Sequence, residues 1–460
     1  MPKKPVSSAR HAEPSVSLSA RGAARLLARH PWVYRSDIAG DKDIPPGSVV
    51  RVQDQRGKFL GTALYSSSSQ IAIRMISHGS VSTDDLPALV ADRIRAAIAY
   101  RKENNLVSNT NAYRIVFSEA DFLPGLIVDR YNDVLSLQIL TQAMDTAPVR
   151  KAIVATLESA WEQKSAREQE PTWGRTPSSV HAERSSAPTT SSTDPELPPP
   201  ATVQLAGILE RVDPRIRELE QLPPRQSGLL SKTKSSTEIT MNGVRFHYDG
   251  LEGQKTGAFL DQRENYAAAA RYAHGEALDA FCYQGGFALH IAPNCSSVTG
   301  VDSSRPALEM ADKNATLNER TLNAQTKNAR PNRLEIEWIE ANAFDLLRDY
   351  SAANRRYDTI ALDPPAFAKS KRDLEKALGG YKELNLRAMK MLRPGGILVT
   401  CSCSFHVSPA DFLKIVADAA QDAHKSLRLL ESRGASQDHP ILLNVPETSY
   451  LQCLILSVSD

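Results

Sequence analysis

The sequence predicts an α/β protein whose C-terminal half is a doubly wound, mostly parallel sheet, preceded by a small β-barrel and a small α/β central domain. Two observations carry this prediction. From about residue 236 onward, short apolar runs alternate with longer segments of helical periodicity, the layout of strand–helix units. Residues 17–82 instead hold short alternating runs broken by turn residues, which is typical of a small barrel. At about 100–200 residues per domain, a chain of 460 residues has room for all three parts.

The composition excludes several classes of protein. No run of about 18 consecutive apolar residues exists, so we expect no membrane-spanning helix. The start, Met1-Pro2-Lys3-Lys4-Pro5, lacks the apolar core of about 7–15 residues that a secretory signal needs. The chain has 5 cysteines, too few and too oddly numbered for a disulfide framework. We therefore expect a cytoplasmic protein with free thiols.

The formal net charge of +2 conceals an uneven distribution. Residues 1–95 hold 14 Lys and Arg against 8 Asp and Glu, a balance of +6, and the remaining chain holds 41 against 45, a balance of −4. Cations and aromatics are interleaved at Arg21, Arg25, Arg29, His30, Trp32, Tyr34 and Arg35. Such interleaving suits phosphate contacts with base stacking; the alternative is a solvated face beside two buried aromatics.

Two segments lack the periodicity of helices and strands, one at the N-terminus and one within the central domain. Residues 1–16 are polar and Pro/Ser-punctuated, and we expect a disordered tail. Residues 165–200 contain seven Pro, seven Ser and five Thr with almost no aliphatic side chains, so we expect a disordered insertion there. Between 84 and 235 the pattern predicts a helix over 84–104, strands over 113–117, 125–130 and 134–140, a helix over 146–162 and a strand over 205–211.

A glycine turn with an acidic partner marks the start of the C-terminal domain, which spans 236–460. The first expected strand contains Asp279 and runs into Gly285-Gly286; a second strand ends in Asp302, 23 residues after Asp279. Such a unit binds the nucleoside part of a cofactor, the acid accepting hydrogen bonds from ribose hydroxyls. The G-x-G-x-x-G fingerprint is absent, and Asp279 would repel a pyrophosphate but suits a cationic ligand such as S-adenosylmethionine. The alternative is an ordinary tight turn.

Two further motifs follow expected strands. Asp363-Pro364-Pro365 ends one, and Cys401-Ser402-Cys403-Ser404 ends the next. Because ligands of doubly wound sheets lie outside the carboxyl ends of the strands, both should converge on the cofactor. A thiolate there has a defined task, since attack at C6 of cytosine makes C5 nucleophilic enough to take a methyl group. The alternatives are cysteines that fill the core, which we also expect of Cys282, Cys295 and Cys453, and a two-cysteine metal site, which no spaced His or Cys completes, so we expect no metal.

Several motifs occur along the chain in the order in which they occur in a known protein family. They are Arg29-His30-Pro31-Trp32-Val33-Tyr34, the run from Glu119 to Arg130, Gln254-Lys255-Thr256-Gly257, Leu260-Asp261-Gln262-Arg263, the run from Asp279 to Phe287, Asp363-Pro364-Pro365-Ala366-Phe367 and Thr400-Cys401-Ser402-Cys403-Ser404. From about Leu18 to the C-terminus, apart from the insertion, the chain resembles the bacterial large-subunit ribosomal RNA cytosine-C5 methyltransferases that carry an N-terminal PUA domain.

The resemblance implies an RNA-binding PUA barrel, a small linker domain and a class I S-adenosylmethionine-dependent methyltransferase domain. It implies Cys401 as the nucleophile, with Cys403 as a rival that would point the same way from a strand. Asp363 would lie near the methyl group and the base. The implied cofactor-binding residues are Lys255, Asp261, Gln262, Asp279, Phe281, Gly285, Asp302, Asn342, Ala343 and Asp363. The implied partner is large-subunit ribosomal RNA, bound through the basic N-terminal domain. We expect no membrane partner, and a homodimer is left open.

The motifs also depart from related enzymes. Many RNA cytosine-C5 methyltransferases have a second cysteine after the acid of the fourth strand, and Asp363-Pro364-Pro365 has none, which leaves the base for the C5 proton unassigned. Ala258 stands where an aromatic residue is expected. Two other functions stay open: amine methylation that uses Asp363-Pro364-Pro365, and a non-catalytic RNA-binding assembly module. An oxidoreductase is disfavoured because the pyrophosphate loop is missing.

Overall fold

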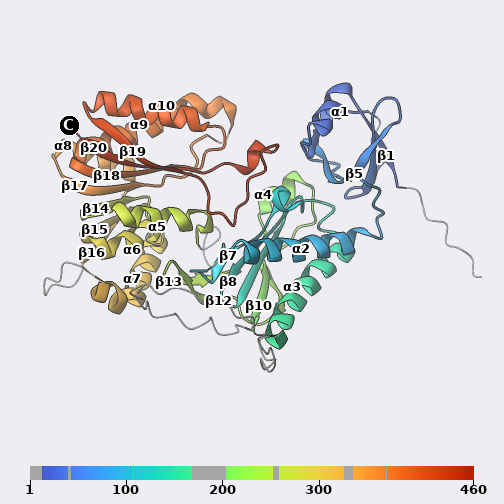
Figure 1. The fold of residues 1–460 in the computed structure, drawn as a ribbon, viewed down its shortest axis with the longest axis horizontal. Helices are drawn as coiled ribbons and strands as arrows, with labels where there is room; N and C mark the ends of the chain where they lie inside the picture. Colours follow the sequence, from blue (N-terminus) through green and yellow to red (C-terminus); the bar gives the residue numbers. More distant parts are fainter. Residues whose placement is uncertain are drawn as a thin grey trace, which may run out of the picture.

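The computed structural model describes residues 13–39, 43–106, 108–167, 204–251, 258–325, 335–368 and 370–459. Its strands form three sheets and a two-stranded hairpin, and the predicted α/β class is confirmed. Figure 1 shows the N-terminal sheet (blue) as a separate lobe, the central sheet (cyan to green) beside it, and the C-terminal sheet (yellow to red) on the far side. Within the described residues no helix is long and apolar enough to cross a membrane.

The N-terminal lobe is a six-stranded sheet with the order β2-β6-β5-β4-β1-β3. Its elements are β1 (Ser15–Leu18), α1 (Ala20–Leu27), β2 (Trp32–Tyr34), β3 (Ile38–Ala39), β4 (Val49–Gln53), β5 (Phe59–Tyr65) and β6 (Ile71–Ser77). The predicted disordered tail, residues 1–16, is too long by four residues. Ser15 and Val16 belong to β1, because Val16 is buried in the core of the lobe and β1 pairs with β4, and Glu13 and Pro14 before them accept hydrogen bonds from the Thr83 and Arg51 amides. Residues 1–12 lie outside the described part of the chain.

The central sheet has the order β11-β10-β9-β8-β7, and α2 and α3 pack together over it. Its elements are α2 (Leu86–Glu103), β7 (Ala112–Phe117), β8 (Leu126–Tyr131), β9 (Val134–Ile139), α3 (Ala147–Arg167), β10 (Gly207–Glu210), α4 (Pro214–Leu219) and β11 (Gly228–Lys232). The predicted helix over 146–162 continues to Arg167, into the first three residues of the predicted insertion, where Ala166 and Arg167 are good helix formers. Residues 168–200, the rest of the predicted insertion, lie outside the described part, as do residues 201–203.

The hairpin of β12 (Ser236–Met241) and β13 (Val244–Asp249) joins the central and C-terminal sheets. It turns at Asn242-Gly243, both at positive φ, which is the two-residue connection that fits the twist of paired strands. Tyr248 of β13 stacks on Tyr131 of β8 with ring centroids 3.7 Å apart. Phe246 lies in the same apolar cluster as residues of the C-terminal sheet. One continuous core therefore runs from the central sheet through the hairpin into the C-terminal sheet.

The C-terminal sheet has the order β16-β15-β14-β17-β18-β20-β19, with the first five strands parallel. β20 runs antiparallel to both its neighbours. The strands are β14 (Gly275–Ala280), β15 (Cys295–Asp302), β16 (Glu335–Glu340), β17 (Tyr357–Leu362), β18 (Leu392–Ser402), β19 (Ser426–Arg433) and β20 (Gln452–Ser459). The central parallel strands are buried on both faces, which explains their almost unbroken apolar runs.

Helices cover both faces of this sheet. Figure 1 shows α9 and α10 above it and α5, α6 and α7 below it. The helices are α5 (Arg263–Tyr272), α6 (Gly286–Ile291), α7 (Arg305–Gln325), α8 (Ala343–Ala352), α9 (Leu374–Met391) and α10 (Pro409–Asp422). Strand order reverses between β14 and β17, so the carboxyl ends of these strands open a crevice at the topological switch point.

Candidate active site

A cavity of about 570 Å³ lies at the carboxyl ends of β14, β15, β17 and β18. Its walls also include the lip segment after residue 257, the 3-10 helix Leu260–Gln262 and the chain just before β20. The polar and thiol side chains that line it are Asp261, Gln262, Tyr266, Asp279, Cys282, Tyr283, Gln284, Asp302, Ser303, Ser304, Asp363, Cys403 and Tyr450. Four of these are carboxylates from four separate segments, so the cavity is strongly acidic.

Asp279 sits at the floor of the cavity with no exposed surface. Its Oδ2 accepts a hydrogen bond of 2.8 Å from the Ala288 amide of α6, whereas its Oδ1 is buried without a partner among the described residues. Burial raises the pKa of Asp279 well above its ordinary value; the Ala288 amide opposes this shift, and Asp363 and Asp302 add to it. An unpartnered buried acceptor is costly, so this oxygen is suited to a ligand that brings a donor with positive charge.

The turn between β14 and α6 is held in an uncommon backbone conformation. Gly285 caps α6 at φ +85°, and Phe281 and Tyr283 also have positive φ values of 67° and 50°. Non-glycine residues in this region carry strain and cluster at functional sites. Asp302 fastens the turn to β15, because its Oδ2 accepts from the Tyr283 amide (3.0 Å) and its Oδ1 accepts from the Ser304 amide (2.9 Å). Each carboxylate oxygen has a second lone pair, which remains available to hydroxyl donors.

Asp363 and Gln262 meet across the cavity. The Gln262 side-chain amide donates to Asp363 Oδ1 at 2.9 Å, and the Asn265 amide donates to Gln262 Oε1 at 2.7 Å. Burial raises the pKa of Asp363 to about 7, the negative charge of Asp261 adds to the shift, and the hydrogen bond from Gln262 opposes it. At neutral pH this carboxyl group therefore holds a proton in a large fraction of molecules and can act as a hydrogen-bond donor.

The two cysteines of the Thr400–Ser404 motif lie in different environments. Cys401 has no exposed surface, belongs to the apolar core and is paired across the sheet with Cys453 of β20. Burial raises the pKa of the Cys401 thiol well above its ordinary value. Cys403 lines the cavity, with its Sγ 3.6 Å from the Pro364 carbonyl oxygen.

The expectation that both thiols point the same way is wrong, because β18 ends at Ser402 and the chain turns before Cys403. Residues two apart share a face only within a strand. The cavity wall therefore contains the thiol of Cys403 and not that of Cys401.

Three other residues expected at the cofactor are placed elsewhere. Asn342 is the N-cap of α8, and its Oδ1 accepts from the Phe344 (2.9 Å) and Asp345 (3.4 Å) amides. Ala343 is buried in the core of the sheet, and neither residue lines the cavity. Gly285 shapes the turn, while its neighbours Gln284 and Gly286 line the cavity. Lys255 lies outside the described residues.

Aromatic side chains complete the cavity, and the sequence reasoning missed most of them. Phe259 and Tyr283 pack edge to face across the opening, with ring centroids 5.2 Å apart. The Tyr450 hydroxyl donates to Asp261 Oδ2 at 2.6 Å. Phe259 follows the lip motif and could have been found there, whereas Tyr450 lies 189 residues from Asp261 and carries no local signal.

Comparisons with known proteins agree with this geometry. A PUA-like domain family matches residues 16–78, and an S-adenosylmethionine-dependent methyltransferase family matches residues 226–442. Ribosomal RNA large subunit methyltransferase I of Tolumonas auensis is 35% identical, over 94% of this chain and 96% of that protein. The protein of the same name from Photobacterium profundum is 34% identical, over 93% and 95%. The chain belongs to the ribosomal RNA large subunit methyltransferase I family.

Solved structures agree on the fold of this methyltransferase. The crystal structure of SMU.776 complexed with SAH matches with a TM-score of 0.72, over 96% of this chain and 100% of that one, at 17% sequence identity. A Streptococcus mutans structure described as SAM-dependent matches with a TM-score of 0.70 over the same shares of both chains. At this identity the likeness is one of fold, and it extends over all three sheets.

The cavity of this methyltransferase fits S-adenosylmethionine, its cofactor. The unpartnered Oδ1 of Asp279 matches a cationic amino group, and the Asp302 carboxylate can accept from ribose hydroxyls. The apolar rings of Phe281 and Phe287 line the same space. A volume of about 570 Å³ lies within the range of small-molecule and cofactor sites. Among the described residues, no group of three or more His, Cys, Asp or Glu side chains is arranged as metal ligands.

Proposed function

We propose that this methyltransferase adds a methyl group to C5 of a cytidine in large-subunit ribosomal RNA, with Cys403 as the nucleophile. The RNA substrate is supported by the names of its relatives and by the PUA-like domain at residues 16–78. The observation that carries the nucleophile is the location of Cys403 in the wall of the cavity, beside Pro364 and Asp363.

In the proposed reaction, the Cys403 thiolate forms a bond to C6 of the cytosine, and the C5–C6 electron pair becomes available at C5. S-adenosylmethionine supplies the methyl group that C5 accepts. Loss of the C5 proton to a base and departure of the Cys403 thiolate then restore the double bond. The protonated Asp363 carboxyl donates to the ring nitrogen N3 and stabilises the negative charge that thiolate addition places on the base.

We propose that Asp279 binds the amino group of the cofactor and that Asp302 binds its ribose. Asp261 and Gln262 form the lip at the methionine end, and Gln262 also holds Asp363 toward the base. Asn342 has its side-chain oxygen engaged as a helix cap, so we do not retain it at the adenine. Phe281 packs edge to face with Phe344, with centroids 6.1 Å apart, and offers an aromatic surface on that side.

We propose the basic N-terminal lobe as the RNA-docking surface. Two of its arginines lie over aromatic rings: Arg25 is 4.7 Å from the ring centre of Tyr34, and Arg51 is 4.5 Å from that of Phe59. Lys58 is exposed beside Phe59. Arginine stacked on a ring presents a flat cation that can contact phosphate and base together.

The nucleophile is tested by separate Cys403→Ala and Cys401→Ala variants, assayed for methyl transfer to ribosomal RNA and by bisulfite sequencing. We expect Cys403→Ala to reduce methyl transfer to background and Cys401→Ala, a core substitution, to retain turnover within a few-fold. Full activity in both variants would refute the covalent mechanism and favour amine methylation. Loss in Cys401→Ala alone, with its fold intact, would transfer the nucleophile to Cys401.

A further inference from the structure

One segment of the methyltransferase domain leaves its own sheet and crosses to the central domain. Residues 434–451, here called the strap, connect β19 to β20 and extend as a red loop toward α4 in Figure 1. In the far part of the strap Leu443 is 94% exposed, while the side-chain amide of Asn444 beside it donates to the Arg29 carbonyl oxygen of the N-terminal lobe. In the first part of the strap, Ser436, Asp438 and His439 are almost completely buried.

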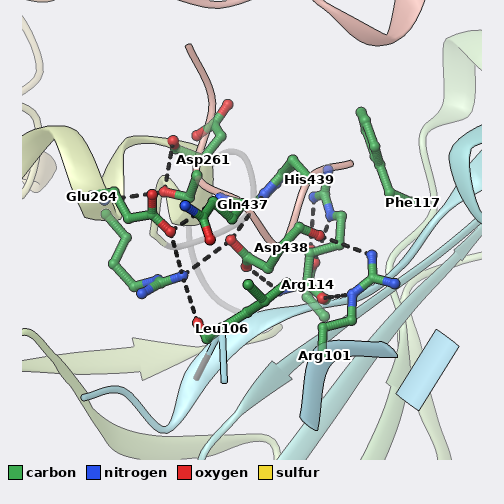
Figure 2. A network of polar contacts seen from close by, with 12 residues as sticks. Arg101, Leu106, Arg114, Phe117, Asp261, Glu264, Gln437, Asp438 and His439 are labelled. Carbon is green, nitrogen blue, oxygen red and sulfur yellow. Dashed lines mark hydrogen bonds and ion pairs between the residues drawn. The ribbon is translucent and has the colours of Figure 1, made fainter. Parts of the chain in front are cut away.

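Asp438 fastens the strap to the central domain and to α5 at once (Figure 2). Its Oδ2 accepts from the Arg114 amide of β7 at 2.7 Å, and its Oδ1 accepts from Arg263 Nη2 at 3.2 Å. Its backbone oxygen accepts from Arg101 Nη2 of α2 at 2.8 Å. Arg101 is itself fixed by two hydrogen bonds to Asp121, of 2.5 and 2.8 Å.

The charge on Asp438 is well compensated in spite of its complete burial. Burial opposes ionisation, but the neighbouring His439 side chain, the Arg263 guanidinium and the Arg114 amide outweigh it and hold the pKa of this carboxyl group well below its ordinary value. A buried carboxylate of this kind is costly once a partner is lost, so its geometry tolerates little change. The position of the strap is therefore sharply defined by both of its neighbours.

The same strap holds the lip of the cofactor cavity. The Ser436 amide donates to the Asp261 carbonyl oxygen at 2.7 Å, and the Ser436 hydroxyl accepts from the Glu264 amide at 3.0 Å. At the other end of the strap, the Tyr450 hydroxyl donates to Asp261 Oδ2. Strap residues therefore form hydrogen bonds with both the main chain and the side chain of Asp261, which lines the cavity next to Gln262.

We propose that Asp438 is a positioning residue for cofactor binding: by fixing the strap between the central domain and α5, it holds Asp261 and Gln262 in place at the cavity. This inference rests on the proposed role of the cavity. The two donors Arg114 N and Arg263 Nη2 bind different oxygens of Asp438, so in Asp438→Asn the donor NH2 group faces one of them and the strap and the lip shift. Asp438 does not line the cavity, so its effect reaches the ligand through other residues: through Ser436, Tyr450 and Asp261, and through Arg263, which directly follows Gln262.

The test compares Asp438→Asn with Glu210→Gln in the full-length protein. Glu210 of β10 is also buried, 2% exposed, and pairs with Arg150 at 2.6 Å, but it lies in the central domain away from the strap. Calorimetric titration measures the Kd for S-adenosylmethionine, and steady-state assays measure kcat and KM. We expect Asp438→Asn to raise Kd and the KM for the cofactor about tenfold, with kcat at saturating cofactor within about threefold, and Glu210→Gln to leave the Kd unchanged.

A purely structural role would give a different pattern, because a partly unfolded sample shows fewer binding sites and a lower kcat at an unchanged Kd. That pattern, or an equal rise of Kd in Glu210→Gln, would overturn the proposal. If Asp438→Asn does not fold, the Kd for S-adenosylmethionine is measured in Ser436→Ala instead. A rise of this Kd supports the proposal, and an unchanged Kd refutes it. Failure of the wild-type protein to bind the cofactor would instead count against the proposed cavity itself.

Discussion

At the scale of single residues, the cavity is governed by carboxylates that are hard to ionise. Asp279 and Asp363 both have raised pKa values, and burial is the first cause in each case. The sequence predicted both acids as residues of the cofactor site, but not their raised pKa values, because burial is a property of the folded chain. A cationic ligand relieves both penalties, which links the stability of the free protein to the affinity for its cofactor.

Asp279→Asn keeps the size of the side chain but removes its negative charge and leaves one acceptor oxygen, which the Ala288 amide already occupies. We expect the Kd for S-adenosylmethionine to rise by about 10–100-fold, since a hydrogen bond to a charged group contributes about 1.5–3 kcal/mol. Calorimetric titration measures it. Asp37→Asn, the same change at a buried carboxylate of the N-terminal lobe, should leave the affinity as it is. An unchanged Kd in Asp279→Asn would mean that the amino group binds elsewhere.

The pKa of Asp363 also predicts how stability depends on pH. Its pKa in the folded protein, about 7, lies above the ordinary value of 3.8. The contribution of Asp363 to the free energy of unfolding is therefore complete below pH 3.8 and is lost as the pH rises toward 7. Between pH 5 and pH 8 the cofactor-free wild-type protein should lose about 1–3 kcal/mol more unfolding free energy than Asp363→Asn. Urea unfolding at the two pH values measures the difference. Identical losses in both proteins would contradict the raised pKa.

At the scale of elements, the strands of the C-terminal sheet were predictable because strands buried on both faces leave continuous apolar runs. The ends of strands were harder to predict than the strands themselves. Because β18 ends at Ser402, Cys401 lies within the strand and is buried, whereas Cys403 lies beyond it at the cavity. The Asn242-Gly243 hairpin was readable as a turn signal and was overlooked. The strap could not be predicted from the sequence, because its partners at the lip of the cavity and on α5 lie 169 to 189 residues away along the chain.

The turn between β14 and α6 gives a prediction at this scale. Gly285→Ala places a side chain at φ +85° and a Cβ 3.0 Å from the Trp338 ring, so both strain and displacement follow. We expect a loss of about 1–2 kcal/mol in unfolding free energy and weaker cofactor binding, because Gln284 and Gly286 line the cavity. Gly57→Ala is the matched control, with φ +79° and open space around it. Equal cofactor affinities in the two variants would contradict a role of this turn in binding.

At the scale of the whole molecule, the charge distribution agrees with separate sites for RNA in the N-terminal part and for the cofactor in the C-terminal part. The chain is nearly neutral because a balance of +6 over residues 1–95 offsets −4 over the rest. The acidic share includes the carboxylates that line the cofactor cavity, and the described cations of the basic share lie in the N-terminal lobe and the start of α2. The sequence showed these two signs, but the contact that joins the domains through Asp438 required the structure.

This division predicts that RNA affinity and cofactor affinity can be altered separately. In the double variant Arg51→Gln/Lys58→Gln, two cations of the proposed docking surface are lost near the β4–β5 hairpin, which belongs to the N-terminal lobe that Figure 1 shows apart from the C-terminal sheet. We expect weaker binding to ribosomal RNA fragments and a salt dependence whose log–log slope is reduced by about 0.7 for each lost phosphate contact. The Kd for S-adenosylmethionine should stay at the wild-type value. Filter binding across a series of salt concentrations measures the slope, and an unchanged slope would show that RNA docks on another face of the protein.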